Sequence, residues 1–195
     1  MQSSTWPNTS SRRGRFGRLP GKPSRSRQTK RGGSRQQEPL VIGVISDTHG
    51  LVRPEAVAAL QGSCFIIHAG DLGSEAVLRA LEVIAPVYAV RGNNDHGDWA
   101  AQIPTNRVVT IGQLALYVIH DLKELTVEPA AEGVHAVIAG HSHRPLVERR
   151  NGVLFLNPGS AGPRRFRLPV TVARLHVRET ELEAKVLDLA AQRSR

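Results

Sequence analysis

Continuous apolar runs recur along the chain, and the first three alternate with segments that carry helix signals. These three runs cover residues 40–46, 64–69 and 86–91. Such runs are typical of strands that are buried on both faces of a sheet. Helices are predicted near 54–61, where Pro54 suits the first turn, and near 74–84, where Ser74 suits the N-cap. The resulting β-α-β-α-β order predicts parallel strands joined by right-handed crossovers.

The rhythm changes after residue 106, where apolar runs follow one another more closely. Strands are expected near 107–111, 114–119, 134–139, 145–149, 153–156, 170–176 and 181–187. Arg150-Asn151-Gly152 is a hairpin signal between two of these runs, because Asn-Gly readily adopts the left-handed backbone of a tight turn. Short connections favour antiparallel pairing, so this half of the chain should contain hairpins. The whole pattern predicts an α/β protein.

Charge divides the chain of 195 residues into two parts. The formal net charge is +9, yet residues 1–38 hold ten Lys/Arg and one acid, which leaves 16 basic and 16 acidic residues in 39–195. Because residues 1–38 have few aliphatic side chains to bury, we expect a disordered basic tail followed by one folded domain over 39–195. The tail could bind polyanions weakly, be an inert extension upstream of the natural start, or be a transit peptide without the usual apolar face.

The sequence predicts neither a secretion signal nor a membrane span, since no apolar stretch has the required length or flanks. The single cysteine, Cys64, excludes a disulfide framework. A soluble, cytoplasmic protein without membrane contact is therefore expected.

Short polar runs follow five of the predicted strands and carry the candidate chemistry of the chain. The runs are Asp47-Thr48-His49, Gly70-Asp71, Gly92-Asn93-Asn94-Asp95, His120 and Gly140-His141-Ser142-His143. Because α/β proteins place functional side chains at the carboxyl ends of strands, these groups should converge along one sheet edge. Oxygen and imidazole donors without thiolates suit hard-to-borderline divalent cations. The pattern therefore predicts a metal site with enough donors for two ions.

The order of these runs resembles that of the calcineurin-like metallophosphoesterases over residues 40–188. The short chain and the third polar run resemble the small bacterial and archaeal phosphodiesterases of that superfamily. The resemblance implies an α/β fold with two mixed β-sheets packed as a sandwich and flanked by helices. It also implies hydrolysis of a small or nucleotide-like phosphodiester, in which a hydroxide shared by two metal ions attacks phosphorus.

The resemblance assigns seven ligands to two divalent ions. The first ion would take Asp47, His49 and His143, the second would take Asn93, His120 and His141, and Asp71 would bridge the two. Manganese is the expected metal, with nickel, cobalt, iron and zinc as alternatives. Taken singly, Asp47 and Asn93 could be turn formers and His120 a core histidine. The ligand interpretation depends on the five polar runs occurring together.

Catalytic roles are expected for Asp71, Asn94, Asp95 and Arg144. Larger relatives carry a histidine acid at the position of Asn94, and an amide cannot donate a proton in that way. Good leaving groups should therefore be favoured. Asp121 stands where the family usually has glycine, and it could support His120 or narrow the groove.

Phosphate contacts are expected at the rim of the site. The candidates are Arg144, Ser160 and the backbone near Gly159, with Arg164, Arg165 and Arg167 as a further basic cluster. Among the remaining histidines, His96 is a candidate for a supporting role, whereas His68 and His135 lie within strand-like runs and are expected to be structural.

Two other functions stay open. The same fold serves as a protein-interaction scaffold without catalysis in the retromer complex, and a nucleic-acid-processing phosphoesterase could use the basic tail as its substrate arm. The complete ligand set favours catalysis, and the balanced charge of residues 39–195 argues against a dedicated nuclease. The sequence does not decide between a monomer and a homo-oligomer.

Overall fold

Two five-stranded sheets make up most of the described chain, which covers residues 38–165 and 167–191 of a computed structural model. The first sheet has the order β10 (Glu181–Asp188), β9 (Thr171–Arg178), β1 (Leu40–Ile45), β2 (Phe65–His68) and β3 (Val87–Ala89). The second has the order β4 (Asn106–Ile111), β5 (Leu114–Ile119), β6 (Ala136–Ile138), β8 (Val153–Asn157) and β7 (Leu146–Arg150). The tail predicted over 1–38 lies outside the described residues, apart from Glu38.

The first sheet is mixed, and its parallel part follows the predicted alternation of strands and helices. β1, β2 and β3 are parallel neighbours. Their crossovers contain the helices α1 (Pro54–Leu60) and α2 (Glu75–Glu82). Pro54 is the first residue of α1, and Ser74 is the N-cap of α2 although its side chain makes no capping hydrogen bond. β9 pairs antiparallel with β1 and with β10.

The second sheet combines two hairpins with parallel neighbours. β4 pairs antiparallel with β5, and β7 with β8, where Asn151 and Gly152 form the predicted turn with φ of 49° and 81°. β6 is parallel to both β5 and β8, so the second sheet is mixed, as the resemblance implies. The reason is the long connection from β5 to β6, which contains the 3-10 helix η1 (Leu122–Glu124). η1 and α3 (Asp98–Ala101) are too short to leave a periodic pattern in the sequence.

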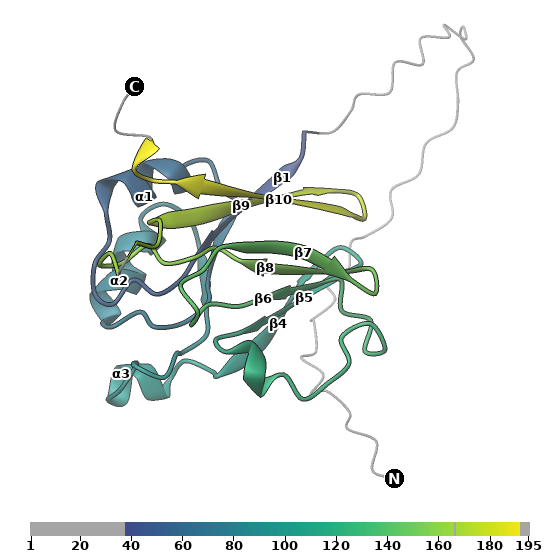
Figure 1. Cartoon of the computed structure of the whole chain (residues 1–195), viewed down its shortest axis with the longest axis horizontal. Helices are drawn as coiled ribbons and strands as arrows, with labels where there is room; N and C mark the ends of the chain where they lie inside the picture. The colour runs from purple at the N-terminus through teal and green to yellow at the C-terminus, as the bar shows by residue number, and fades with distance from the viewer. Residues whose placement is uncertain (1–37, 166, 192–195) are drawn as a thin grey trace, which may run out of the picture. The chain divides into compact units, whose positions relative to one another are not determined.

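The two sheets pack face to face, which is the sandwich that the resemblance implies. The cluster between them includes Ile42, Val44, Ile67, Leu116, Val118, Ile138 and Leu156. A second cluster packs the other face of β1 and β2 against α1 and α2, and it includes Ile45, Leu60, Ile66, Val77 and Leu81. Burial of one such side chain contributes roughly 1.5–3 kcal/mol. Figure 1 shows the two sheets as layers, with α1, α2 and α3 gathered at one side.

Two further sequence expectations concern helices and cysteine. No helix within 38–165 or 167–191 is long and apolar enough to cross a membrane. Cys64 is exposed just before β2. It is the single cysteine of the chain, so no disulfide can form within the chain.

Candidate metal centre

Seven polar side chains lie just beyond the carboxyl ends of five strands. Asp47 and His49 follow β1, Asp71 follows β2, Asn93 follows β3, His120 follows β5, and His141 and His143 follow β6. β1, β2 and β3 are parallel within the first sheet, and so are β5 and β6 within the second. The loops that follow these strands meet at one edge of the sandwich, where α/β proteins commonly place their sites. The structure thus brings all seven predicted ligands together.

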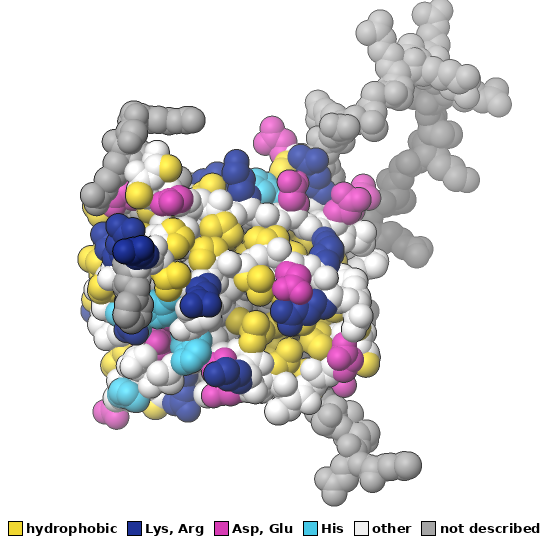
Figure 2. All heavy atoms as spheres, in the orientation of Figure 1, with side chains coloured by type: hydrophobic (Ala, Val, Ile, Leu, Met, Phe, Trp, Pro, Cys, Tyr) yellow, Lys and Arg dark blue, Asp and Glu magenta, His cyan; other side chains and the backbone are white. Residues whose placement is uncertain are grey.

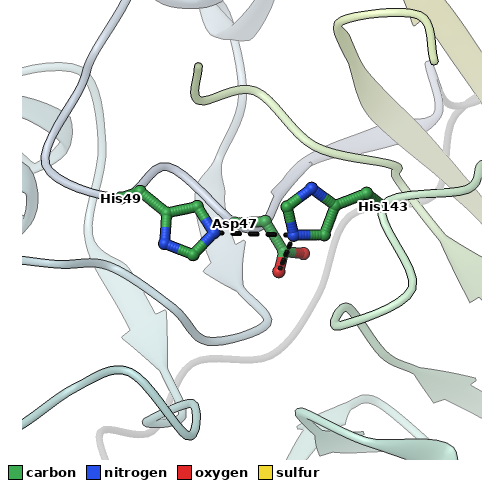
Figure 3. Close-up of side chains that lie close together, drawn as sticks. All are labelled: Asp47, His49 and His143. Carbon is green, nitrogen blue, oxygen red and sulfur yellow. Dashed lines mark hydrogen bonds and ion pairs between the residues drawn. The ribbon is translucent and has the colours of Figure 1, made fainter. Parts of the chain in front are cut away.

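The first group consists of Asp47, His49 and His143, whose side chains point toward one another (Figure 3). Asp47 Oδ1 lies 3.2 Å from His143 Nε2, and the Nε2 atoms of His49 and His143 are 3.5 Å apart. One donor atom from each residue lies within 4.8 Å of the other two. A carboxylate oxygen and two imidazole nitrogens that converge in this way can share one divalent cation.

The second group consists of Asn93, His120 and His141. Asn93 Oδ1 lies 3.1 Å from His120 Nε2 and 3.0 Å from His141 Nδ1. His120 Nδ1 lies 2.7 Å from the Ala69 carbonyl oxygen and donates to it, so a cation bound in the group would meet the lone pair of Nε2. An amide oxygen suits a hard cation but adds no negative charge.

Asp71 lies between the two groups. Its Oδ2 is 3.8 Å from His49 Nε2, and its Oδ1 is 3.5 Å from His120 Nε2. Asn94 holds the carboxylate in this orientation, because its backbone N–H donates to Oδ1 at 2.8 Å and its side-chain amide donates to Oδ2 at 2.6 Å. The two oxygens of Asp71 therefore face different groups, as a carboxylate between two cations would.

Hydrogen bonding keeps Asp71 ionised. Burial raises the pKa of Asp71, but hydrogen bonds from His120 and Asn94 outweigh burial and hold the pKa well below its usual range. Burial lowers the pKa of His120, but contacts with Asp71 and with the Ala69 carbonyl carry that pKa above its ordinary value. Burial also lowers the pKa of His49. Asp71 is thus in the deprotonated form that a metal ligand requires.

Unsatisfied buried atoms in the first group provide a test of whether a cation fits. Within the described residues, Asp47 Oδ1 and His143 Nδ1 are buried without a hydrogen bond. Asp47 is fully buried, and its Oδ1 lies within ion-pair distance of His143 Nε2. A buried carboxylate oxygen is costly unless a cation or hydrogen bonds compensate it. Both the donor chemistry of the first group and the unsatisfied Asp47 Oδ1 are therefore compatible with a bound divalent ion.

Backbone strain is concentrated at the proposed ligands. Five of them have positive φ: Asp47 at 54°, His49 at 47°, Asp71 at 55°, His141 at 64° and His143 at 58°. Non-glycine residues rarely adopt this left-handed conformation, and each such residue costs on the order of 1–3 kcal/mol. Strain of this kind persists where the surrounding structure imposes it, commonly at functional sites. It therefore supports a functional role for these loops, independently of the donor chemistry.

Close approach of the ligand loops requires glycine at two positions. A Cβ added to Gly92 would lie 2.1 Å from Asp71 Oδ1. One added to Gly140 would lie 2.0 Å from Ser46 Oγ and 2.8 Å from Asp47 Oδ2. These distances are far below van der Waals contact, so any side chain here would displace the carboxylates.

Asp95 ties two ligand loops together. It is buried, and its two oxygens accept hydrogen bonds from the backbone N–H groups of Gly73 and Gly92, each at 2.8 Å. These bonds join the loop that carries Asp71 to the loop that carries Asn93. The placement favours a positioning role for Asp95 over the direct catalytic role expected from the sequence.

His68 has a structural role, as expected from its place in a strand-like run, and it lies beside the site. Its Nδ1 accepts a hydrogen bond from Gly70 N–H at 3.2 Å, and its Nε2 lies 3.0 Å from Thr48 Oγ1. Thr48 Oγ1 in turn donates to the Leu72 carbonyl at 3.0 Å. Burial lowers the pKa of His68 to about 4, so the ring is neutral. This buried network joins the loops after β1 and β2.

The rim of the site is basic. Figure 2 shows histidine side chains at the surface with Lys and Arg side chains beside them. Arg165 contacts a proposed ligand, with Nη2 3.3 Å from His49 Nε2. Its loop is fixed to the loop after β1, because Ser160 Oγ and Gly162 N donate to the Asp47 carbonyl at 3.0 and 3.1 Å. Arg144 and His96 are exposed.

Comparison with known proteins agrees with this geometry. The sequence model of the "Calcineurin-like phosphoesterase superfamily domain" matches residues 40–180. A "Probable metallophosphoesterase" of Methanothermobacter thermautotrophicus is 34% identical over 164 residues, which cover 78% of this chain and 94% of the relative. A solved archaeal phosphodiesterase matches with TM-score 0.65 at 26% identity, over 76% of this chain and 100% of that one. Vacuolar Protein Sorting 29 of Cryptosporidium parvum shares the fold, with TM-score 0.61 at 18% identity, over 78% and 98% of the two chains. The chain therefore belongs to the calcineurin-like phosphoesterase superfamily.

Proposed function

We propose that the chain is a phosphodiesterase that depends on two divalent cations and hydrolyses small or nucleotide-like phosphodiesters. The observation that carries this proposal is the position of Asp71, whose oxygens face two separate groups of donors. Membership of the superfamily supports hydrolysis of phosphoesters in general. The solved archaeal relative is named a phosphodiesterase, which supports the narrower substrate class.

The cations would be held by the two groups, with Asp71 in contact with both. Divalent ions in these positions would polarise the phosphoryl oxygens and lower the pKa of a water that attacks phosphorus. Mn²⁺ is the expected ion, because the donors are carboxylate, amide and imidazole without a thiolate. Nickel, cobalt, iron and zinc are the alternatives, since availability and geometry select among such ions more than affinity does.

Arginine side chains are placed to bind the substrate phosphate. Arg165 lies beside His49 on the side of the first group, and a guanidinium can bind two phosphate oxygens at once. Arg144 directly follows His143 and is exposed, so it is a second candidate for the same contact. Arg165 offers positive charge beside the first group, where a phosphodiester anion would approach the cations.

Asn94 determines which leaving groups we expect. Its amide donates to Asp71 and has no proton that it can give up near neutral pH. An alkyl oxygen needs such a proton when it departs, whereas an aryl oxygen or a phosphate group is stable as an anion. Aryl esters, and nucleotide esters whose leaving group is a phosphate, should therefore be hydrolysed faster than alkyl esters.

A protein-interaction scaffold is the competing function, because Vacuolar Protein Sorting 29 shares the fold. At 18% identity that likeness concerns the fold alone. In this chain all seven donor positions hold donor residues, which favours catalysis. A nucleic-acid-processing enzyme is less favoured, because residues 39–195 carry balanced charge.

Hydrolysis after metal removal and return tests the proposal. The purified chain would be treated with a chelator, dialysed, and assayed with and without Mn²⁺ on phosphomonoesters, aryl and alkyl phosphodiesters and cyclic nucleotides. We expect activity only with metal, highest on the aryl diesters. An Asp47→Asn variant purified in the same way controls for contaminating phosphatases. Full activity after exhaustive chelation, or none on any diester with Mn²⁺, would contradict the proposal.

A further inference from the structure

Asp121 faces a different histidine from the one expected. It directly follows His120, but both nitrogens of that ring are already engaged: Nδ1 with the Ala69 carbonyl and Nε2 with the second group. Asp121 Oδ2 lies instead 3.5 Å from His141 Nε2. Asp121 therefore contacts His141 and does not support His120, which was one of the two roles considered from the sequence.

His141 is the histidine that most needs an external support. Its side chain is 40% exposed, against 14% for His49, 5% for His120 and 8% for His143. Packing therefore restrains its ring least. Its Nδ1 points to Asn93 Oδ1 at 3.0 Å, within the second group, so Nε2 is the nitrogen left for a supporting contact.

Asp121 is itself held in place. Its Oδ1 accepts the backbone N–H of Lys123 at 3.0 Å, which begins the η1 turn. Oδ2 is left to face His141. Because the two oxygens have separate partners, the turn fixes the carboxylate in an orientation that serves the imidazole.

The second group is also short of negative charge. Asn93, His120 and His141 are all neutral as ligands, and the group shares the single charge of Asp71 with the first group, which has Asp47 in addition. Asp121 is a further carboxylate, one imidazole away from the second cation position. Negative charge there favours a divalent ion on that side of the site.

We propose that Asp121 is a positioning residue for His141. Its carboxylate accepts the Nε2 proton of His141, which leaves the Nδ1 lone pair directed at the second cation, and its charge raises the affinity of that cation. This inference rests on the proposed two-cation function. It assigns control of the second, weaker cation to a residue outside the set of seven ligands.

Titration of the metal-free, full-length chain with Mn²⁺, followed by calorimetry and electron paramagnetic resonance, tests the inference. We expect two equivalents in the wild type. Asp121→Asn keeps an oxygen for the Lys123 N–H but removes the charge, so a merely structural role would be preserved. In that variant the weaker equivalent should lose about 10–100-fold in affinity while the tighter one is unchanged. Glu183→Gln, an exposed charge removed from β10, should bind both equivalents as the wild type does.

Nitrogen-15 NMR of the metal-free wild type gives a second readout that does not depend on a variant folding. We expect the tautomer of His141 with the proton on Nε2 to be populated beside the Nδ1 tautomer that Asn93 Oδ1 favours, and to be less populated in Asp121→Asn. Equal Mn²⁺ affinities in wild type and Asp121→Asn, or a wild-type His141 protonated on Nδ1 alone, would overturn the inference. A wild type that binds fewer than two equivalents would contradict the proposed function instead, and the NMR result would still decide the Asp121–His141 pair.

Discussion

Asp71 is the residue whose loss should affect both proposed cation positions at once. Asp71→Asn removes the charge shared by the two groups, so affinity for both Mn²⁺ equivalents should fall and hydrolysis should slow by more than about 100-fold, the upper end of what loss of an outer partner costs. Metal content and rate would be measured on the same preparation. Asp47→Asn, whose carboxylate lies 3.2 Å from His143, should weaken the first equivalent more than the second. A variant Asp71→Asn with both cations and near-normal turnover would show that Asp71 is not the bridge.

Asn94→His should extend activity toward poorer leaving groups. The imidazole would supply the proton donor that the amide lacks, and general acids contribute roughly 10²–10⁴-fold to such steps. We expect the ratio of aryl to alkyl phosphodiester rates to fall at least about tenfold. Asn94→Ala is the control, because it loses the side-chain bond to Asp71 without gaining an acid. If the ratio is the same in all three proteins, Asn94 does not lie on the leaving-group side.

Donor residues could be predicted from the sequence, but their partners could not. Each donor follows an apolar run that marks a strand end, so its approximate place at the sheet edge is determined by local sequence. The contact of Arg165 with His49 joins residues 116 positions apart, and no local pattern encodes it. Asp121 stands next to His120 in sequence yet faces His141, because the turn at η1 orients its carboxylate away from its neighbour.

Strand-end loops, more than the strands themselves, determine the geometry of the site. The network of His68 with Gly70 and Thr48 fixes the loops after β1 and β2, and Asp95 fixes the loop after β3. Strands could be predicted because a buried strand has a simple signature in the sequence, a continuous apolar run. Hydrogen bonds between loops have no such signature, so a structural role could be expected for His68 but its partners could not.

Stability of the metal-free chain should depend on pH through His68. Its pKa lies near 4 in the folded chain, below the ordinary value of 6.5, because the ring is buried. The contribution of neutral His68 to the free energy of unfolding is therefore complete above pH 6.5 and is lost as the pH falls toward 4. The loss amounts to about 2 kcal/mol between pH 7 and pH 5. His68→Gln should remove that part of the pH dependence in urea unfolding. His135→Gln, at an exposed histidine, should keep it, and identical slopes for wild type and His68→Gln would contradict the assignment.

Charge is distributed unevenly over the whole molecule, with its excess in residues 1–38. Deleting these residues removes nine net positive charges and leaves every proposed ligand, the first of which is Asp47. Melting temperature, Mn²⁺ binding and turnover of small diesters should stay the same. Retention on RNA should fall at low salt, where screening is weakest, and differ little at high salt. A large drop in melting temperature would show that the segment packs on the folded domain.

The packing of two sheets against each other could be expected only from the family resemblance. Alternating strands and helices predicted the parallel core of β1, β2 and β3. Nothing in the apolar pattern indicated that β6 would lie between β5 and β8, or that β9 would return to pair with β1. Such pairings are decided by packing over the whole domain, which a local pattern does not record.

The central claim is that seven residues hold two divalent cations with Asp71 between them. Anomalous diffraction from crystals of the chain grown with Mn²⁺ tests it directly. We expect two peaks about 3.5–4 Å apart. One peak should be bounded by Asp47, His49 and His143, the other by Asn93, His120 and His141, each with one oxygen of Asp71. A single peak, or peaks that lie away from these residues, would contradict the account.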